Sequence, residues 1–310
     1  MTQRALVVGF GPAGQRHARV LEAMGLEVAV VTRGQAPRHR AWPDLATALR
    51  ETAPEYIVIA NRTSEHHGSV AALASSGYAG IALVEKPLFA ARQDMPDHRC
   101  AAFYVGYNLR FHPALRALRE RIAGEACLSA HVYVGRYLPE MRPDLAQSYR
   151  SNFRARAKEG GGVLRDFSHE LDYLRWLFGD WRRVAALGGH VSALDIDADD
   201  LCAALIEFEH CPAVTLQMNY LDRSLRREIV VNCEGATWRC DLAAGRLEGG
   251  RRAECFAVAL DDTYVAENRA ALFGPPDGLA GAADGIAAVE LVEAIERAQR
   301  ERRWMERLAT

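Results

Sequence analysis

The chain has 310 residues, enough for two domains with a hydrophobic core each. Its composition, 49% apolar and 25% charged with a formal net charge of -2, is that of an ordinary globular protein. So small a net charge gives no electrostatic reason to expect nucleic acid or a membrane surface as partner. No stretch approaches the roughly 18 apolar residues of a membrane span. The first apolar run is also shorter than the ~7–15 residues of a secretory signal, so we expect a cytoplasmic protein.

Cysteine and histidine spacing argues against a disulfide framework and against a metal site. The cysteines are odd in number, scattered, and never spaced as Cys-x-x-Cys, which is typical of reduced, buried thiols. No His-x-x-x-His pair occurs, and the adjacent His66 and His67 cannot face the same way on a helix. We therefore expect no bound metal. The seven cysteines are Cys100, Cys127, Cys202, Cys211, Cys233, Cys240 and Cys255.

Short apolar runs alternate with helix-like segments in the first hundred residues. The runs are rich in β-branched residues and do not alternate in polarity, as expected of parallel strands buried on both faces. A β-α-β-α-β order predicts a doubly wound parallel sheet of the Rossmann type. The expected strands are 5–8, 28–31, 56–60, 81–84 and 103–106, and the expected helices are 15–24, 45–51 and 69–76.

The pattern then changes to alternating polarity, which predicts an antiparallel sheet with one packed face. It is clearest at 206–209, 214–220 and 238–242. Near the end, Ala288, Leu291, Val292 and Ile295 have the spacing of an amphipathic helix. We predict a Rossmann domain at 1–118 and an α+β domain with a large, open, mainly antiparallel sheet at 119–310. An uncovered sheet face favours a homo-oligomer, either a dimer or a tetramer.

A glycine-rich turn joins the first strand to the first helix. Gly9 permits the tight turn, Gly11 lets the backbone approach a pyrophosphate, and Gly14 lets the helix pack closely. The helix start, with Pro12 and Ala13, supplies free amides and a positive dipole end for phosphates. The turn therefore predicts a dinucleotide site.

The end of the second strand bears on the choice of cofactor. NAD-binding proteins usually carry an acid there, whereas this chain has Thr32 and Arg33, and Glu27 lies at the wrong end of the strand. A guanidinium can pair with a 2′-phosphate through two hydrogen bonds. This favours NADP(H) over NAD(H), the alternative being that Arg33 simply points into solvent.

Several motifs resemble, in order, those of the Gfo/Idh/MocA oxidoreductases, which include glucose-fructose oxidoreductase and inositol dehydrogenase. The resemblance implies a Rossmann domain, a second domain with a large open sheet, and an active site in the cleft between them. The matching segments are the glycine turn running on to His17, Thr63-x-x-His66, Glu85-Lys86-Pro87, the stretch 105–113, the glycines at 160–162, and Asp166-x-x-His169-x-x-Asp172.

The resemblance implies that Lys86 and His169 serve the chemistry. Histidine, with an ordinary pKa of ~6.5, is suited to accept the hydroxyl proton during hydride transfer. A lysine ammonium stabilises the alkoxide character that develops. Asp166 could hold the imidazole, although it precedes His169 by three residues where many family members have four. Asp172 is the other acid that could serve.

The remaining candidates surround these two residues. Asn61, His66 and Glu85 are expected on the cofactor side, and Glu85 is expected to orient either the lysine or the nicotinamide ribose. Asn108 and Arg110 follow the fifth strand and are expected near the substrate, as are Arg150, Arg165 and Asp172.

The stretch 149–158 is strongly basic. It is either a solvated loop or a cover that favours a substrate with a carboxylate or phosphate. The expected function is NADP(H)-dependent oxidation or reduction of a hydroxyl or carbonyl carbon in a sugar derivative. The alternative is a dinucleotide-binding sensor or regulator that has kept the fold and lost the chemistry.

Overall fold

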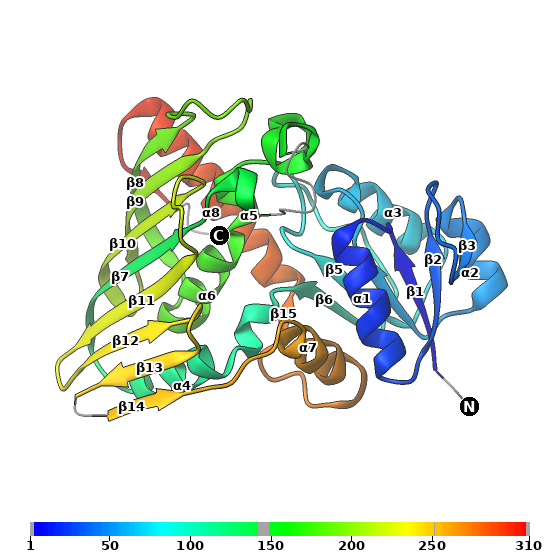
Figure 1. The fold of residues 1–310 in the computed structure, drawn as a ribbon, viewed down its shortest axis with the longest axis horizontal. Coiled ribbons are helices and arrows are strands. Elements are labelled where there is room, and N and C mark those ends of the chain that lie inside the picture. Colours follow the sequence, from blue (N-terminus) through cyan, green and yellow to red (C-terminus); the bar gives the residue numbers. More distant parts are fainter. Residues whose placement is uncertain (1–2, 142–148, 251, 308–310) are drawn as a thin grey trace. The chain divides into compact units, whose positions relative to one another are not determined.

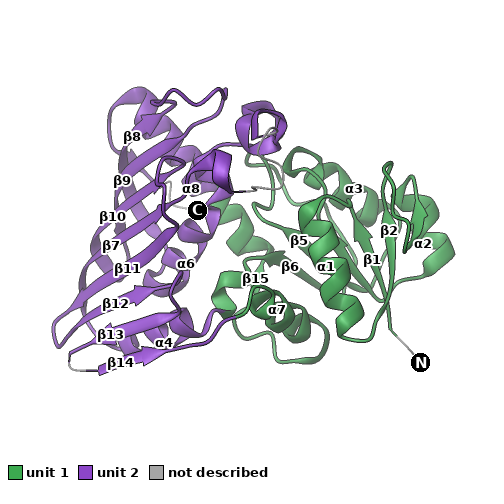
Figure 2. Ribbon diagram, in the orientation of Figure 1, with its two compact units in different colours: residues 1–111, 259–289 green, residues 112–258, 290–310 purple. Residues whose placement is uncertain are grey.

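The computed structural model describes residues 3–141, 149–250 and 252–307. The chain forms two compact units, coloured separately in Figure 2. The first contains Met1–Phe111 and Ala259–Val289, and the second contains His112–Val258 and Glu290–Thr310. Within the described ranges, no helix combines the length and the apolar character that crossing a membrane requires.

The first unit is built on a seven-stranded sheet in the order β15-β6-β5-β4-β1-β2-β3 (Figure 1). All neighbouring pairs are parallel except β15 with β6. This confirms the doubly wound sheet, and the short strands β3 and β15 are the two that the sequence did not indicate. The strands are β1 (Arg4–Val8), β2 (Glu27–Val31), β3 (Arg40–Trp42), β4 (Tyr56–Ile59), β5 (Ile81–Glu85), β6 (Ala102–Gly106) and β15 (Ala280–Gly281).

Helices cover both faces of this sheet and create two separate cores. On one face α1 (Pro12–Ala23) and α7 (Asp262–Phe273) pack against side chains such as Val7 and Val58. On the other, α2 (Leu45–Thr52) and α3 (His66–Ser75) pack against the alternate residues of the same strands. Burial on both faces explains why the strands read as continuous apolar runs.

The segment 259–289 returns to the first unit, whereas the sequence suggested a single boundary after residue 118. Its strand β15 extends the sheet beside β6, and α7 packs on α1 and on the short 3-10 helix η2 (Asn108–Phe111). The sequence of α7 does not indicate that this segment packs in the first unit. An apolar stripe shows that a helix packs against another element, but it does not show which element that is.

The second unit is built on a nine-stranded sheet in the order β14-β13-β12-β11-β7-β10-β9-β8-β16. Every neighbouring pair is antiparallel except β10 with β7. The prediction of a large, mainly antiparallel sheet is therefore confirmed. The strands are β7 (Cys127–Gly135), β8 (Trp181–Gly189), β9 (Leu201–Phe208), β10 (Cys211–Asn219), β11 (Arg226–Cys233), β12 (Thr237–Asp241), β13 (Arg246–Gly249), β14 (Arg252–Cys255) and β16 (Met305–Glu306).

Helices cover one face of this second sheet. They are α4 (Pro113–Ile122), α5 (Val163–Asp166), α6 (Ser168–Phe178) and the latter part of α8 (Ala282–Glu301), which includes Leu291, Val292 and Ile295 of the predicted amphipathic stretch (Figure 1). Short 3-10 helices complete the chain: η1 (Thr63–Glu65), η3 (Leu138–Glu140), η5 (Phe153–Ala155) and η6 (Ala157–Glu159).

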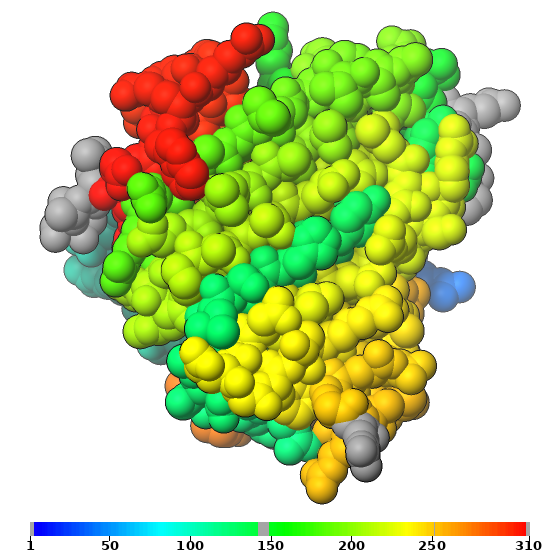
Figure 3. Space-filling view, turned by 90° about the vertical axis from the view of Figure 1, so that its left-hand side faces the viewer, coloured from blue at the N-terminus to red at the C-terminus, as the bar shows by residue number. Residues whose placement is uncertain are grey.

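The other face of the second sheet is open. Figure 3 shows its strands side by side with no helix over them. On this face Leu187 pairs with Ala203 and Leu205 pairs with Ala185 across β8 and β9. Leu187 is 71% exposed and Leu205 is 41% exposed, so this corner of the open face is apolar.

Candidate dinucleotide and catalytic site

The three glycines of the turn differ in whether the fold itself requires them. Gly9 has φ +92°, and a Cβ there would lie 2.5 Å from the backbone of Asn61. A Cβ on Gly14 would overlap the carbonyl oxygen of Gly9. Gly11, in contrast, has an ordinary φ of -71°, and a Cβ there would meet nothing within 4 Å. The fold therefore requires glycine at positions 9 and 14, but nothing in the described structure requires it at position 11.

The turn lies where the order of the strands reverses, between β1 and β4. Open α/β sheets bind ligands at this switch point, outside the carboxyl ends of the strands. Helix α1 begins there without a side-chain cap, so its first amides have no partner within the helix. Asn61, just after β4, donates to Ser69 Oγ at 2.8 Å, while its Oδ1 is buried and has no hydrogen-bond partner in the described part of the chain. This edge of the sheet thus carries the free amide donors of α1 and one acceptor, Asn61 Oδ1, that has no partner among the described residues.

The end of β2 carries the two residues that favoured NADP(H). The Thr32 hydroxyl accepts a hydrogen bond from the Gly34 amide at 3.0 Å, and Arg33 is exposed. Arg40, further along, lies over the ring of Trp42 at 5.1 Å. Arg33 therefore remains accessible to a ligand at this end of the strand.

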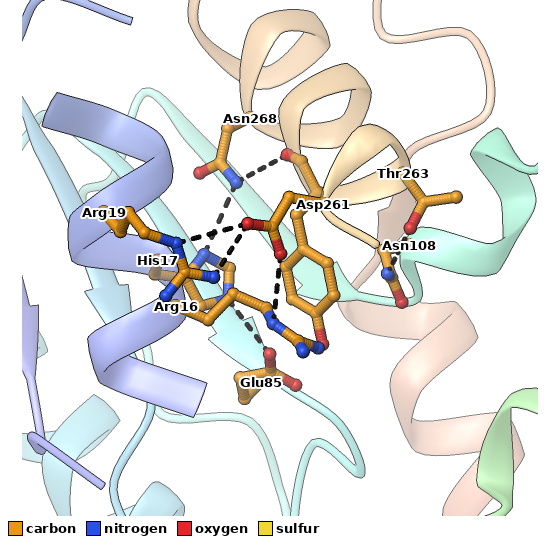
Figure 4. A network of polar contacts seen from close by, with 9 residues as sticks. Arg16, His17, Arg19, Glu85, Asn108, Asp261, Thr263 and Asn268 are labelled. Carbon is orange, nitrogen blue, oxygen red and sulfur yellow. Dashed lines mark hydrogen bonds and ion pairs between the residues drawn. The ribbon is translucent and has the colours of Figure 1, made fainter. Parts of the chain in front are cut away.

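Glu85, the last residue of β5, is buried and bonded on both of its oxygens. Its Oε1 lies 2.9 Å from His17 Nε2 (Figure 4). Its Oε2 accepts the Lys86 amide at 3.1 Å. Burial favours the neutral acid, but the hydrogen bond from His17 and the charge of Lys86 outweigh it, so the pKa of Glu85 lies below its usual value. A carboxylate is therefore held directly beside the backbone of Lys86.

His66 holds the chain on either side of this point together. Its Nδ1 lies 3.0 Å from the Pro87 carbonyl oxygen, and its Nε2 lies 3.2 Å from that of Asn61. Burial lowers the pKa of His66. The side chain expected on the cofactor side thus faces backbone carbonyls of the loops that follow β4 and β5, and the neutral ring donates to one of them. Lys86 itself is partly exposed.

Asn108 and Arg110, expected near the substrate, are both buried inside the first unit. Asn108 Nδ2 donates to Thr263 Oγ1 at 2.7 Å, and Arg110 Nη1 pairs with Asp284 Oδ2 at 3.3 Å. Both partners belong to the returning segment 259–289. These two side chains therefore attach that segment to the Rossmann sheet.

His169 lies on α6 in the second unit, whereas Lys86 belongs to the first. Residues Ser168–Leu174 are all buried, and His169 is 9% exposed, which excludes the solvent-facing placement that its helical position had left open. Asp166 accepts from Arg154 Nε at 2.7 Å and from the Tyr220 hydroxyl at 3.2 Å. A buried aspartate thus precedes the helix that carries His169.

The other expected substrate residues are distributed over the second unit. Arg165 forms a two-pronged pair with Glu296 of α8, whose longer contact is 3.3 Å. Arg150 is exposed and pairs with Asp195 at 2.7 Å. Asp172 is buried on α6. Arg156 also pairs within the loop, with Glu159 at 3.2 Å, so the basic stretch is partly neutralised by its own surroundings.

Sequence reasoning missed the contributions of α7. The Asn268 Nδ2 lies 3.4 Å from His17 Nδ1. The centroid of the Tyr264 ring lies 5.2 Å from that of the His17 ring. The signal for them was absent because they come from residues assigned to the other domain. Among the described residues, no group of three or more His, Cys, Asp or Glu side chains could hold a metal ion.

The fold combines a Rossmann unit, which carries the glycine turn, with a second unit built on an open sheet. Residues 115–239 match the family model described as GFO/IDH/MocA C-terminal domain. The match agrees with the resemblance that the ordered motifs indicated. A search of curated protein sequences found no match.

Solved structures share the whole fold at low sequence identity. GenD2 from gentamicin A biosynthesis, in complex with NAD, is 23% identical with a TM-score of 0.82, covering 99% of this chain and 97% of its own. The WlbA dehydrogenase from Bordetella pertussis, in complex with NADH and UDP-GlcNAcA, is 19% identical with a TM-score of 0.79, covering 100% and 99%. A levoglucosan dehydrogenase in complex with NADH is 16% identical with a TM-score of 0.83 and covers 100% of both chains.

Proposed function

We propose that the protein is a nicotinamide-dependent oxidoreductase that transfers a hydride to or from a hydroxyl or carbonyl carbon of a sugar derivative. The observation that carries the proposal is the contrast within the glycine turn. Gly9 and Gly14 are fixed by contacts inside the fold, whereas the space beside Gly11 at the switch point is open. Close approach of a pyrophosphate requires a glycine at this point of the turn, and no contact inside the fold explains the glycine at position 11. The similar structures contain NAD or NADH, in agreement with this proposal.

The chemistry is assigned to Lys86 and His169. The nicotinamide supplies hydride acceptance or donation. His169 accepts the hydroxyl proton when the alcohol is oxidised and returns it in the reverse direction. The ammonium of Lys86 stabilises the developing alkoxide. Glu85 holds the Lys86 amide at 3.1 Å and so fixes the chain from which that ammonium projects.

Substitution of the two proposed catalytic residues tests the assignment. We expect Lys86→Met and His169→Asn each to lower kcat by at least ~10²–10⁴-fold, the usual contribution of one acid-base group. Cofactor affinity, measured by nicotinamide fluorescence, is expected to change little. A Lys86→Met enzyme with full activity would exclude the mechanism, while binding without turnover in wild-type protein would favour a dinucleotide-binding regulator.

NADP(H) is proposed as the preferred cofactor because Thr32 and Arg33 end β2 where NAD-binding folds usually place an acid. We expect NADPH to bind at least tenfold more tightly than NADH, or about 1.4 kcal/mol. Arg33→Gln is expected to remove most of that difference, while Arg40→Gln, whose guanidinium stacks on Trp42, serves as the control. Preference for NADH in the wild-type protein would overturn the choice of cofactor and leave the enzyme proposal standing.

The substrate class proposed is a sugar that bears a carboxylate or phosphate. The names of the similar structures support sugars, and one of them contains UDP-GlcNAcA. Arg150 is an exposed guanidinium of the basic stretch, and its partner Asp195 is itself exposed. We expect Arg150→Gln to raise KM for an acidic sugar and to leave KM for its neutral analogue unchanged. An unchanged KM for both would contradict the acidic-substrate proposal.

A further inference from the structure

The buried residues around His17 determine which of its nitrogens carries a proton. Tyr56 donates its hydroxyl to Asn268 Oδ1 at 2.9 Å, and Asn268 Nδ2 donates to the Tyr264 carbonyl at 2.8 Å. These two bonds fix the orientation of the Asn268 amide, because a carbonyl oxygen can only accept and burial keeps the Tyr56 hydroxyl protonated by raising its pKa. The remaining Nδ2 hydrogen therefore faces His17 Nδ1, at 3.4 Å.

His17 Nδ1 must accept this hydrogen bond, so the proton of the neutral imidazole is on Nε2. That nitrogen lies 2.9 Å from Glu85 Oε1, to which it donates (Figure 4). The Asn268 amide on one side and the Glu85 carboxylate on the other thus specify the Nε2–H form of the ring. The chain of donors thus runs in one direction, from Tyr56 through Asn268 and His17 to Glu85.

We propose that His17, oriented by Asn268, is a positioning residue that keeps Glu85 ionised and aimed at the Lys86 amide. The inference rests on the proposed function, in which Lys86 is catalytic. It assigns a task to a fully buried histidine on the glycine-turn helix and to an asparagine 251 residues away along the chain. Without the His17 donor, Glu85 would be a buried acid with one bond fewer, and burial would then favour its neutral form.

The sign of the pH effect follows from the groups that face Glu85. These are His17 on α1, Lys86 beside it, Tyr264 on α7 and His66 after η1. Burial opposes the charge of Glu85, while His17 and Lys86 support it. Loss of the His17 donor therefore raises the pKa of Glu85, and the acidic limb of the kcat/KM profile should move to higher pH.

The test compares His17→Leu, which removes the donor, with His17→Gln, whose amide can donate to Glu85. Asn268→Leu removes the group that orients the imidazole, and Arg19→Gln on the exposed side of the same helix is the control. The titration of Glu85 is followed by carboxyl ¹³C resonances of labelled glutamate, assigned with Glu85→Gln. The pH dependence of kcat/KM is measured for each variant that folds, as judged by circular dichroism.

We expect His17→Leu to raise the pKa of Glu85 by about one unit or more. The acidic limb of the kcat/KM profile should move to higher pH by a similar amount. His17→Gln should restore much of the wild-type behaviour, and Asn268→Leu should shift both in the same direction by less. An unchanged Glu85 titration in His17→Leu would overturn the inference. If the titration moves but no substrate is turned over by any variant or by wild type, the positioning role stands and the proposed function fails.

A second, independent observation concerns two cysteines of the open sheet. Cys127 on β7 and Cys233 on β11 are register partners, and their Sγ atoms lie 3.7 Å apart. The Cys233 amide donates to Ala236, while the Glu234 amide donates to Ala126, so the two cysteines form a non-hydrogen-bonded pair. The register shifts between Asn232 and Cys233, so the pair lies at an irregularity of the ladder, and the Sγ–Sγ distance of 3.7 Å shows that the two side chains nevertheless face each other closely.

We infer that Cys127 and Cys233 form a disulfide when a small-molecule disulfide oxidant is present. The two thiols lose two electrons and two protons as the Sγ–Sγ bond forms. The oxidant's own disulfide bond breaks and yields two thiols. Burial raises the pKa of Cys127 to about 12, so the reaction should be slow at neutral pH and faster in alkaline solution.

The experiment treats folded Cys255→Ser protein with oxidised glutathione at increasing pH, because Cys255 is the exposed thiol that would compete. Mass spectrometry should show loss of two hydrogens and a peptide linking Cys127 to Cys233. Cys127→Ser should abolish the product, and Cys240→Ser should leave it unchanged. Thiols that stay reduced up to the pH at which the fold is lost, or a different cysteine pairing, would disprove the inference.

Discussion

At the scale of single residues, the glycine turn separates what the fold needs from what a ligand needs. Gly9 and Gly14 have backbone neighbours where a Cβ would be, while Gly11 has none within 4 Å. Glu85 is a second residue whose state depends on particular neighbours. It is a buried charge supported by named donors, and such donors are the ordinary condition for keeping a carboxylate ionised in the interior.

Alanine substitutions at the three glycines should therefore give two distinct results. We expect Gly9→Ala and Gly14→Ala to lower the free energy of unfolding by about 1–3 kcal/mol, because of strain and overpacking. Gly11→Ala should change it by less than about 0.5 kcal/mol and yet weaken dinucleotide binding by tenfold or more. Urea unfolding and nicotinamide fluorescence measure the two effects. A Gly11→Ala protein that binds dinucleotide as wild type does would contradict the proposed pyrophosphate site.

At the scale of elements, the three glycines before α5 connect two segments of the second unit. A Cβ on Gly161 would overlap the carbonyl oxygen of Phe153, and one on Gly162, which has φ +103°, would overlap the carboxylate of Asp199. Asp199 accepts the Leu164 amide at 3.0 Å, and burial raises the pKa of Asp199 to about 6. The turn that leads into α5 and α6 is thus built around a carboxyl group that is easily protonated.

This carboxyl group should leave a signature in the dependence of stability on pH. The folded protein binds the Asp199 proton more tightly than the unfolded chain does, so ionisation destabilises the fold as pH rises from about 4 to 6 and the full cost persists above 6. Asp199→Asn should remove the cost, giving a gain of about 1–3 kcal/mol at pH 8 that shrinks toward pH 4. Chemical denaturation of both proteins at several pH values measures the difference, and a difference independent of pH would contradict it.

At the scale of the whole molecule, the open face of the second sheet leads us to propose a homo-oligomer. Paired positions on β8 and β9 place two exposed leucines and two alanines on one side of the sheet. Exposed apolar area of this kind usually marks an interface. The physical reason is that a sheet with helices on only one face leaves its other face to water unless another copy covers it.

Charge placed on this face should favour the monomer. We expect the double variant Leu187→Lys and Leu205→Lys to have a lower molar mass by light scattering than wild type at equal micromolar concentration. Leu260→Lys, at a 75% exposed site in the first unit, is the matched control and should have no effect. A wild-type protein that is monomeric across the micromolar range would contradict the oligomer itself.

The sequence by itself predicted five strands of the first sheet, three segments of the second, and the character of each sheet. Apolar runs such as 56–60 became strands buried on both faces, and alternating runs such as 214–220 became strands with one packed face. Glycine spacing also located the turn at the start of α1. These features are local, since periodicity and backbone freedom depend on a few neighbouring residues.

Only the tertiary structure decided which distant residues share a site. It returned 259–289 to the first unit, so that Asn268 orients His17 and Thr263 receives Asn108. It also buried Asn108, Arg110 and His66, which the motifs had suggested near ligands. Such partnerships depend on contacts between segments far apart in the chain, and no spacing within one segment encodes them. Packing therefore decided which of the residues named by the motifs support one another inside the fold.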